Sequence, residues 1–336
     1  MLARNILAQL VYRSGLWRPL ANRSAYRILM YHRVVSPSSL PYPLEPGMFV
    51  TPETFSRQCK FLKNEMLVLP LAELVELALA RKPAPPRAVA ITFDDGYRDF
   101  FEHALPALDL HGLPATVFLP TAFTGTERMF PYDNLAAELE RARIHEEFRE
   151  KLYYALADEH LRVFVDLLFH AQSNLLKREI LSQTIARLKQ LDRTKRSVIL
   201  NAVAALSTPG FYPRTFMNWD EVRQSQEKGI TFASHSHNHL YLDEQSPDEI
   251  LEDTRISIQM LEKHGVAALD YYCFPNGNFT PAALAVLESL GIQAGIATGR
   301  VRHNLAETPI VLSRIGVHQD ITGSNAGFAL RLVLRS

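Results

Sequence analysis

Two adjacent carboxylates close a run of mostly apolar residues. Val89–Phe93 is followed directly by Asp94, Asp95 and Gly96. In parallel α/β folds, ligands sit at the carboxyl ends of the strands. Adjacent side chains at a strand end project in different directions, so one carboxylate can bind a metal while the other accepts a proton. The alternative interpretation is a turn and helix cap, because Asp is also a favoured N-cap residue.

Three histidines at alternate positions follow a second β-type run. Ile230–Ser234 is succeeded by His235, His237 and His239. His235 and His239 share a face if the chain turns helical after the strand, and His237 then faces away. Two neutral imidazoles and one carboxylate form a facial triad that leaves metal positions open for water and substrate. We therefore predict that His235, His239 and Asp95 bind a divalent metal.

Two further β-type runs are followed by residues that could take part in binding or catalysis. Tyr271–Phe274 precedes Pro275–Gly277, a Pro-Asn-Gly sequence that favours a tight turn. Such a turn can present backbone N–H groups to a ligand oxygen, although a plain turn is the alternative interpretation. Ile28–Tyr31 is followed by His32.

Taken together and in this order, the motifs resemble those of the polysaccharide deacetylase family, the carbohydrate esterases with a NodB-homology domain. The first three family motifs are matched by Thr-Phe-Asp-Asp-Gly at 92–96, His-Ser-x-x-His at 235–239 and Phe-Pro-x-Gly at 274–277. The branch with a Tyr-His pair at the start of the domain is matched by Leu-Met-Tyr-His-Arg-Val at 29–34, by Trp219 and by Leu-Ser-Arg-Ile at 312–315.

The resemblance implies a metal-dependent hydrolase that removes acetyl groups from a polysaccharide, an oligosaccharide or a glycolipid. N-acetyl groups are the expected substrate groups, ahead of O-acetyl groups. It implies that Asp94 is the base, that the backbone N–H of Asn276 stabilises the oxyanion and that His32 is the general acid. His318, after the last strand, is the alternative acid. Zinc is the expected metal, with cobalt, nickel, manganese and iron as alternatives.

The chain departs from the family pattern in two places. Many members carry Arg two residues before the proline of the third motif, where this chain has Cys273. Arg314 is the candidate substitute that would orient the base. Many members also have an aromatic residue after that proline, where this chain has Asn276. The backbone donor is kept, but an apolar wall against the acetyl group is lost.

An α/β pattern surrounds these residues. From residue 27 on, short β-type runs alternate with helical patterns, which is typical of βα units that build a parallel sheet or barrel. The resemblance implies a distorted (β/α) barrel with fewer than eight strands. The predicted strands span residues 28–31, 66–69, 88–93, 115–119, 230–234, 271–274 and 293–297.

One segment interrupts the alternation. Residues 133–207 carry no strand-like run and form several amphipathic helical patterns, so we predict a helical insertion in the barrel. We expect it to act as a substrate-side lid or docking element; a passive stabilising subdomain is the alternative. The predicted domains are an N-terminal amphipathic segment at 1–26, the barrel at 27–132 and 208–320, and a C-terminal tail at 321–336.

Composition excludes several classes of protein. Lys and Arg number 36 and Asp and Glu number 36, so the absence of net charge argues against a general nucleic-acid binder. A hydrophobic content of 47% and a charged content of 21% exclude disorder for most of the chain. Only Cys59 and Cys273 are present, too few for a disulfide framework. No apolar run approaches the ~20 residues of a membrane-spanning helix.

The first twenty residues resemble a targeting segment only in part. Asn5, Gln9 and Arg13 interrupt the apolar run, which argues against a cleaved signal peptide. We expect an amphipathic helix that docks on the domain or lies on a membrane surface. The expected location is the cytoplasm or the inner-membrane periphery, with secretion as the alternative. The expected partner is an acetylated glycan or lipid-linked sugar, and the sequence predicts no oligomeric state.

Two other functions are compatible with parts of the pattern. A facial-triad Fe(II) oxygenase also uses two His and one carboxylate, but that site normally has His-x-Asp close together on an all-β scaffold. Here Asp95 lies far before the histidines on an α/β pattern. A non-catalytic carbohydrate-binding or scaffold protein is the third hypothesis. The spare carboxylate of Asp94 argues against it, because a binding protein does not need one beside the metal.

Overall fold

The chain forms two compact units in a computed structural model that describes residues 2–45, 47–208, 210–299, 305 and 309–334. The barrel unit consists of Met1–Val35, Phe49–Thr126 and Phe216–Ser336, and the helical unit of Ser36–Met48 and Glu127–Thr215. None of the helices in the described ranges is long and apolar enough to cross a membrane.

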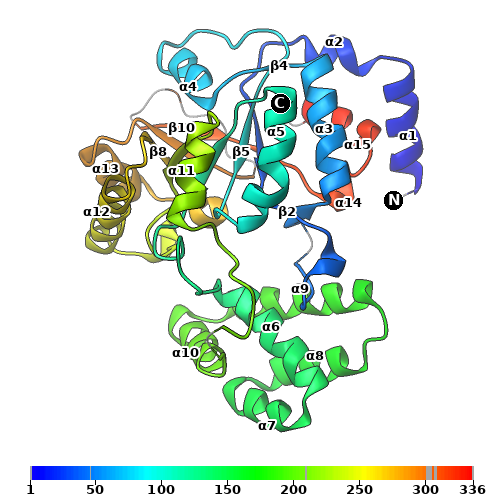
Figure 1. The fold of residues 1–336 in the computed structure, drawn as a ribbon, viewed down its shortest axis with the longest axis vertical. Helices are drawn as coiled ribbons and strands as arrows, with labels where there is room; N and C mark the ends of the chain where they lie inside the picture. Colours follow the sequence, from blue (N-terminus) through cyan, green and yellow to red (C-terminus); the bar gives the residue numbers. More distant parts are fainter. Residues whose placement is uncertain (1, 46, 209, 300–304, 306–308, 335–336) are drawn as a thin grey trace. The chain divides into compact units, whose positions relative to one another are not determined.

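A parallel sheet forms the centre of the barrel unit (Figure 1). Its order is β10-β9-β8-β7-β6-β5-β1-β11, with β4 paired to β5 off this path. These neighbouring strands all pair in parallel, as expected for strands joined by helical crossovers. The strands are β1 (Arg27–Tyr31), β4 (Leu67–Val68), β5 (Ala88–Phe93), β6 (Thr116–Leu119), β7 (Thr231–Ser234), β8 (Ala268–Cys273), β9 (Ala294–Ala297), β10 (Ile310–Ser313) and β11 (Ile315–Gly316).

One continuous segment joins the two ends of that order. β10 pairs with β9 at one end and β11 pairs with β1 at the other, and only Arg314 separates β10 from β11. The segment Ile310–Gly316 therefore brings the two edges of the sheet together. Counted once, it gives a ring of β1, β5, β6, β7, β8, β9 and this segment, which confirms the predicted distorted barrel with fewer than eight strands.

Strand alternation determines which side chains lie inside the ring. All six residues of β5 are buried, and its apolar residues belong to two different clusters. Val89, Ile91 and Phe93 pack outward against helices, in a cluster that also contains Leu29 and Val117. The alternate residues form the second cluster, which includes Ile28, Ala88, Ala90, Phe118, Ala233, Cys273, Ile296 and Leu312. The same two-residue period places Thr92, Asp94 and Arg314 in line with this inner set.

Helices surround the sheet of the barrel unit. Several begin with a Thr or Ser cap residue followed by a proline, and the cap oxygen accepts a hydrogen bond from the backbone N–H three residues after it. Ser246 and Glu249 form a complete capping box. The helices are α1 (Leu2–Arg13), α2 (Trp17–Ala21), α3 (Pro52–Glu65), α4 (Leu71–Leu79), α5 (Leu105–His111), α11 (Trp219–Glu227), α12 (Pro247–Lys263), α13 (Pro281–Ser289), α14 (Gln319–Thr322) and α15 (Asn325–Leu334). A separate two-stranded pair joins β2 (Arg33–Val34) to β3 (Phe49–Val50).

The two ends of the chain pack together. α1 lies against α15, and Val11 and Tyr12 pack on the barrel core. Of the two placements expected for the N-terminal segment, the structure thus shows docking on the domain. Residues 321–336 were expected to be a tail, but α15 buries Phe328 and Leu332. Its apolar periodicity explains the difference, because it gives the helix a face that must be covered.

The helical unit contains the predicted insertion and one further segment. Its helices are α6 (Pro131–Ile144), α7 (Glu146–Ala155), α8 (Glu159–His170), α9 (Asn174–Gln190) and α10 (Arg193–Ala204). Residues 36–48, which we predicted to belong to the barrel, pack with this unit instead. Tyr42 explains this in part, because its buried ring packs edge-on against Tyr212.

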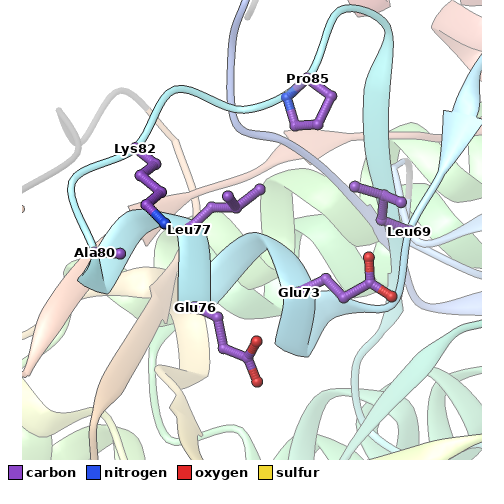
Figure 2. Close-up of a pocket in the computed structure, with 7 residues that line it drawn as sticks. All are labelled: Leu69, Glu73, Glu76, Leu77, Ala80, Lys82 and Pro85. Atoms are coloured by element: carbon purple, nitrogen blue, oxygen red, sulfur yellow. The ribbon is translucent and has the colours of Figure 1, made fainter.

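A surface pocket of about 440 Å³ lies beside α4 (Figure 2). Its lining comes from Leu69 just before α4, from α4 and from the loop that leads into β5: Leu69, Glu73, Glu76, Leu77, Ala80, Lys82 and Pro85. These residues precede the start of β5, whereas Asp94 follows its carboxyl end. The pocket therefore contains none of the predicted site residues.

Candidate active site

Three predicted metal ligands meet at the carboxyl ends of β5 and β7. One oxygen of Asp95, Oδ1, lies 3.3 Å from Nε2 of His235 and 3.3 Å from Nε2 of His239. The imidazole rings are 5.0 Å apart and steeply inclined. All three donor atoms lie within 4.8 Å of one another. The arrangement is that of a carboxylate and two imidazoles directed at a common point.

The donor chemistry fits a divalent metal. Asp95 is 3% exposed, and its Oδ1 faces the two Nε2 atoms at 3.3 Å but makes no hydrogen bond within the described residues. A buried carboxylate oxygen that no hydrogen bond satisfies is costly unless a cation is bound there. Nδ1 of His235 lies 2.9 Å from the carbonyl oxygen of Cys273. Donation to that carbonyl leaves Nε2 free to bind a metal, as in many metal sites.

The electrostatics of the ligands are consistent with such a site. Burial favours the neutral form of Asp95, but the two imidazoles more than offset this and hold its pKa well below the usual range. Burial lowers the pKa of His239 and favours the neutral ring that binds metals. Burial also acts on His235, but the neighbouring acidic groups, Asp95 and Asp94 among them, outweigh burial and raise its pKa.

Asp94 faces a different set of partners. Its two oxygens accept hydrogen bonds of 2.5 Å and 2.7 Å from the guanidinium of Arg314, whose side chain is 0% exposed. Arg314 also donates to Thr92 and to the carbonyl oxygen of Ala297. Burial raises the pKa of Asp94, but Arg314 outweighs burial and the carboxyl stays ionised. The structure thus brings Arg314 to the carboxylate that it was expected to orient.

Cys273 stands beside this ion pair, at the position where many family members carry Arg. Its Sγ lies 3.1 Å from Nη2 of Arg314 and 3.5 Å from Oδ1 of Asp94. Burial raises the pKa of the thiol, so Cys273 is neutral. A small neutral side chain on β8 therefore leaves room for a guanidinium that comes from the β10–β11 junction.

The two candidate acids occupy the same region. Nε2 of His32 lies 3.8 Å from Oδ2 of Asp94, and the ring is 17% exposed. His318 is the N-cap residue of α14 and is 19% exposed, with its Nδ1 3.6 Å from Asp320. Of these two histidines, His32 is the one that contacts the base within the described ranges.

The third motif forms the predicted turn. Pro275–Gly277 is a short helical turn in which Asn276 has a φ of +58°. Gly277 donates to the carbonyl of Phe274 at 2.8 Å. A Cβ at Gly277 would lie 2.1 Å from Cγ2 of Thr298, so this turn requires glycine. Asn276 itself is exposed, which leaves its side chain outside the core.

Left-handed backbone is concentrated in the site. Asp95, Ser236, His239 and Asn276 all have φ between +58° and +71°. Non-glycine residues adopt this region at a cost, and such residues cluster where function needs a particular geometry. Three of them lie in the first two sequence motifs and the fourth in the third motif.

Sequence reasoning missed one residue that contacts the histidine loop. The carboxylate of Asp253, on α12, accepts hydrogen bonds from the backbone of His237 and Asn238. A signal was available, because Asp253 shares the buried face of α12 with Ile250 and Leu261. His237 itself is directed elsewhere, with its Nδ1 2.9 Å from Oγ1 of Thr121.

Comparisons with known proteins show which family the sequence matches. The family model described as Polysaccharide deacetylase matches residues 81–150 and 176–295. The Bacillus subtilis (strain 168) protein named "Putative polysaccharide deacetylase YxkH" is 34% identical over 94 residues. That alignment covers 27% of this chain, and the chain spans only 30% of the length of that relative.

Solved structures share the fold. The Streptococcus pyogenes deacetylase PplD in complex with acetate aligns with a TM-score of 0.55 and 17% identity, over 89% of this chain and 95% of that one. IcaB from Ammonifex degensii aligns with a TM-score of 0.56 and 15% identity, over 92% of this chain and 98% of that one. Identities this low show a common architecture.

Proposed function

Because the chain belongs to the polysaccharide deacetylase family, we propose that it removes acetyl groups from a polysaccharide by hydrolysis, with N-acetyl groups as the preferred substrate groups. The observation that supports the proposal is that two adjacent buried carboxylates have different partners. Asp95 faces two imidazoles, whereas Asp94 faces Arg314. A binding protein would not need the second carboxylate, and a facial-triad oxygenase would not be expected on this parallel barrel.

A divalent metal is the proposed cofactor, with Asp95, His235 and His239 as its ligands. Two imidazoles and a carboxylate, with open positions, suit catalytic zinc, and cobalt, nickel, manganese and iron are the alternatives. When bound, the metal supplies Lewis-acid polarisation of the acetyl carbonyl and of the attacking water.

The remaining residues provide proton transfer and charge stabilisation. Ionised Asp94, held in place by Arg314, accepts the proton of the attacking water. The backbone N–H of Asn276 donates to the oxygen that becomes negatively charged. His32, 3.8 Å from Asp94, donates a proton to the departing sugar nitrogen. His318 is the alternative donor if a substrate lies closer to α14.

Two measurements test the proposal. A panel of N-acetylated and O-acetylated glycans and glycolipids is incubated with the purified protein, with and without a chelator, and released acetate is measured. We expect chelator-sensitive release. Asp94→Asn should keep the metal and the fold but lose about 10²–10⁴ in kcat, because a neutral amide cannot accept the proton. Chelator-insensitive release, or near-normal turnover by Asp94→Asn, would contradict the mechanism.

For the helical unit we propose a role in recognising the polymer. The chain enters this unit after β6 and returns before β7, so the insertion starts at the end of the barrel where catalytic loops are found. Its surface carries exposed apolar side chains, among them Val163 at 57% and Leu167 at 50% on α8. Single exposed apolar residues are ordinary, but two on one helical face suit a glycan or lipid-linked sugar.

Replacing residues 133–207 with a Gly/Ser linker tests this role. We expect kcat/KM to fall on the polymer and to be kept on a small acetylated sugar, with unchanged metal content. Equal kcat/KM on the polymer would leave only a passive stabilising role. Loss on both substrates with loss of metal would indicate damage to the barrel.

For location we propose the cytoplasmic face of an anionic membrane, reached through the N-terminal segment. Leu10 and Leu16 are 62% and 63% exposed, beside the exposed Arg13, and residues 1–44 contain no Asp or Glu. Apolar and basic side chains together favour the surface of anionic lipid. Sedimentation with phosphatidylglycerol vesicles, but not with phosphatidylcholine vesicles, is the expected result; Leu10→Glu should weaken it. Equal sedimentation with both lipids would contradict the proposal.

A further inference from the structure

The loop that carries His239 has an unusual backbone. His235–His239 leaves the end of β7, and both Ser236 and His239 have left-handed φ values, +69° and +58°. Residues with side chains adopt this region only where their surroundings impose it. The His239 imidazole is therefore directed at the metal site by a conformation that the local sequence does not favour.

Asp253 supplies the contacts that impose it. This carboxylate, 4% exposed, accepts four hydrogen bonds from three consecutive loop residues. Oδ2 accepts from the Ser236 hydroxyl at 2.5 Å and from the His237 N–H at 2.8 Å. Oδ1 accepts from the backbone and the side-chain amide of Asn238, at 2.9 Å and 3.0 Å. Hydrogen bonds to a charged acceptor are stronger than neutral ones.

The Ser236 hydroxyl extends this restraint past the histidine. While it donates to Asp253, its oxygen accepts from the backbone N–H of Leu240 at 3.0 Å. The restrained backbone thus includes the residues on both sides of His239. Ser257, one turn after Asp253 on α12, adds a bond to the Ser236 carbonyl at 3.3 Å.

His235 is held by other means. Its backbone N–H donates to the carbonyl of Leu119 on β6, and its Nδ1 contacts the Cys273 carbonyl. Neither contact involves α12. Loss of the Asp253 carboxylate should therefore displace His239 and leave His235 in place.

We infer that Asp253 is a positioning residue for the metal site, which sets His239 against Asp95 by holding the loop in its left-handed conformation. The inference rests on the metal ligands of the proposed function. Residues that orient metal ligands typically change metal affinity about 10–100-fold when they are replaced. We expect an effect of that size on zinc affinity.

The experiment measures the zinc dissociation constant of the full-length protein by competition with a chromophoric chelator. Asp253→Ala should weaken zinc binding about 10–100-fold. Asp253→Asn has nearly the same volume and keeps the loop packed, but it turns one acceptor oxygen into an NH₂ that faces an N–H or hydroxyl donor, so it should also weaken binding. Glu252→Ala is the matched control, since Glu252 lies next to Asp253 in the sequence, is 58% exposed and forms a surface ion pair with Arg255.

Double variants separate positioning from general damage. In a His239→Ala background, Asp253→Asn should change zinc affinity by less than about threefold, because the ligand that it positions is gone. In a His235→Ala background, Asp253→Asn should keep its full effect. The visible spectrum of the Co²⁺-loaded Asp253→Asn protein should shift toward that of His239→Ala, a change that loss of global stability would not produce.

The outcomes are distinct. Zinc affinity of Asp253→Asn within about threefold of wild type, or an equal effect in the His239→Ala background, would overturn the role of Asp253. Absence of stoichiometric zinc in the wild-type protein would instead remove the metal site of the proposed function.

Discussion

Arg314→Met removes a guanidinium from the most enclosed part of the site. The Arg314 side chain is 0% exposed and makes two short hydrogen bonds to Asp94, which is itself 4% exposed. Met fills much of the same volume but leaves the Asp94 carboxylate buried with no cation bonded to it from β10–β11. Breaking a buried pair by removing one partner costs about 3–5 kcal/mol. We expect that loss in the free energy of unfolding near neutral pH.

The pH dependence supplies a more specific test. In the wild type, Arg314 holds the pKa of Asp94 below its unfolded value, so this pair stabilises the protein above the unfolded pKa and loses its effect as pH falls through the folded pKa. Without Arg314, burial dominates and raises the pKa of Asp94 above the unfolded value. The variant then gains stability relative to wild type as the carboxyl becomes protonated. The difference in the free energy of unfolding between wild type and Arg314→Met should therefore shrink as pH falls from about 7 to about 4.

Urea unfolding followed by tryptophan fluorescence measures this difference. Both tryptophans, Trp17 and Trp219, lie in the barrel unit, so the signal reports on the unit that contains the pair. A chelator in all samples removes differences in metal binding. Arg255→Met is the control, because that arginine is 47% exposed and its pair should be worth under about 1 kcal/mol. The reasoning would be refuted if Arg314→Met lowered the free energy of unfolding by less than about 1 kcal/mol, or if this destabilisation grew on acidification.

Four other substitutions have defined outcomes. His32→Ala should keep the metal and lower kcat about 10²–10⁴-fold, whereas His318→Ala should have a smaller effect; the reverse order would assign the acid to His318. Gly277→Ala should lower kcat about 10²–10³-fold with the metal retained, because its Cβ would displace the turn from Thr298; normal kcat would exclude a role for the turn's N–H. His237→Ala should keep full metal content, measured by atomic absorption, since its ring contacts Thr121; loss of metal would make it a ligand.

The strand-end motifs were predictable because their signals are local. Asp94 and Asp95 end a run that is buried throughout, and the predicted strand 88–93 coincides with β5. The parallel barrel then brings residues far apart in sequence to one edge, so the meeting of Asp95 with His235 followed from topology. Even the pairing of Arg314 with Asp94 was anticipated, from the missing arginine at position 273.

Features that depend on three-dimensional context were missed. In the sequence, Asp253 looks like an ordinary solvent-facing acid on an amphipathic helix. Only its position on the same helical face as Ile250 and Leu261 distinguishes it from the exposed acids. β10 and β11 were not among the predicted strands, because β11 is two residues long and the pair changes partner at Arg314. Residues 36–48 have no regular periodicity, so nothing local assigned them to the helical unit.

The position of Arg314 at the closing segment has a consequence during biosynthesis. A chain is synthesised from its N-terminus and can begin to fold before synthesis is complete. Arg314 is added 220 residues after Asp94. Until that segment arrives, β1 and β9 present open edges that invite intermolecular pairing, and the Asp94 carboxylate lacks its cation. Closure of the ring and completion of the base therefore occur in the same late event. A nascent chain arrested before residue 314 would be prone to aggregate and also inactive, so no half-closed, partly active enzyme is expected to accumulate.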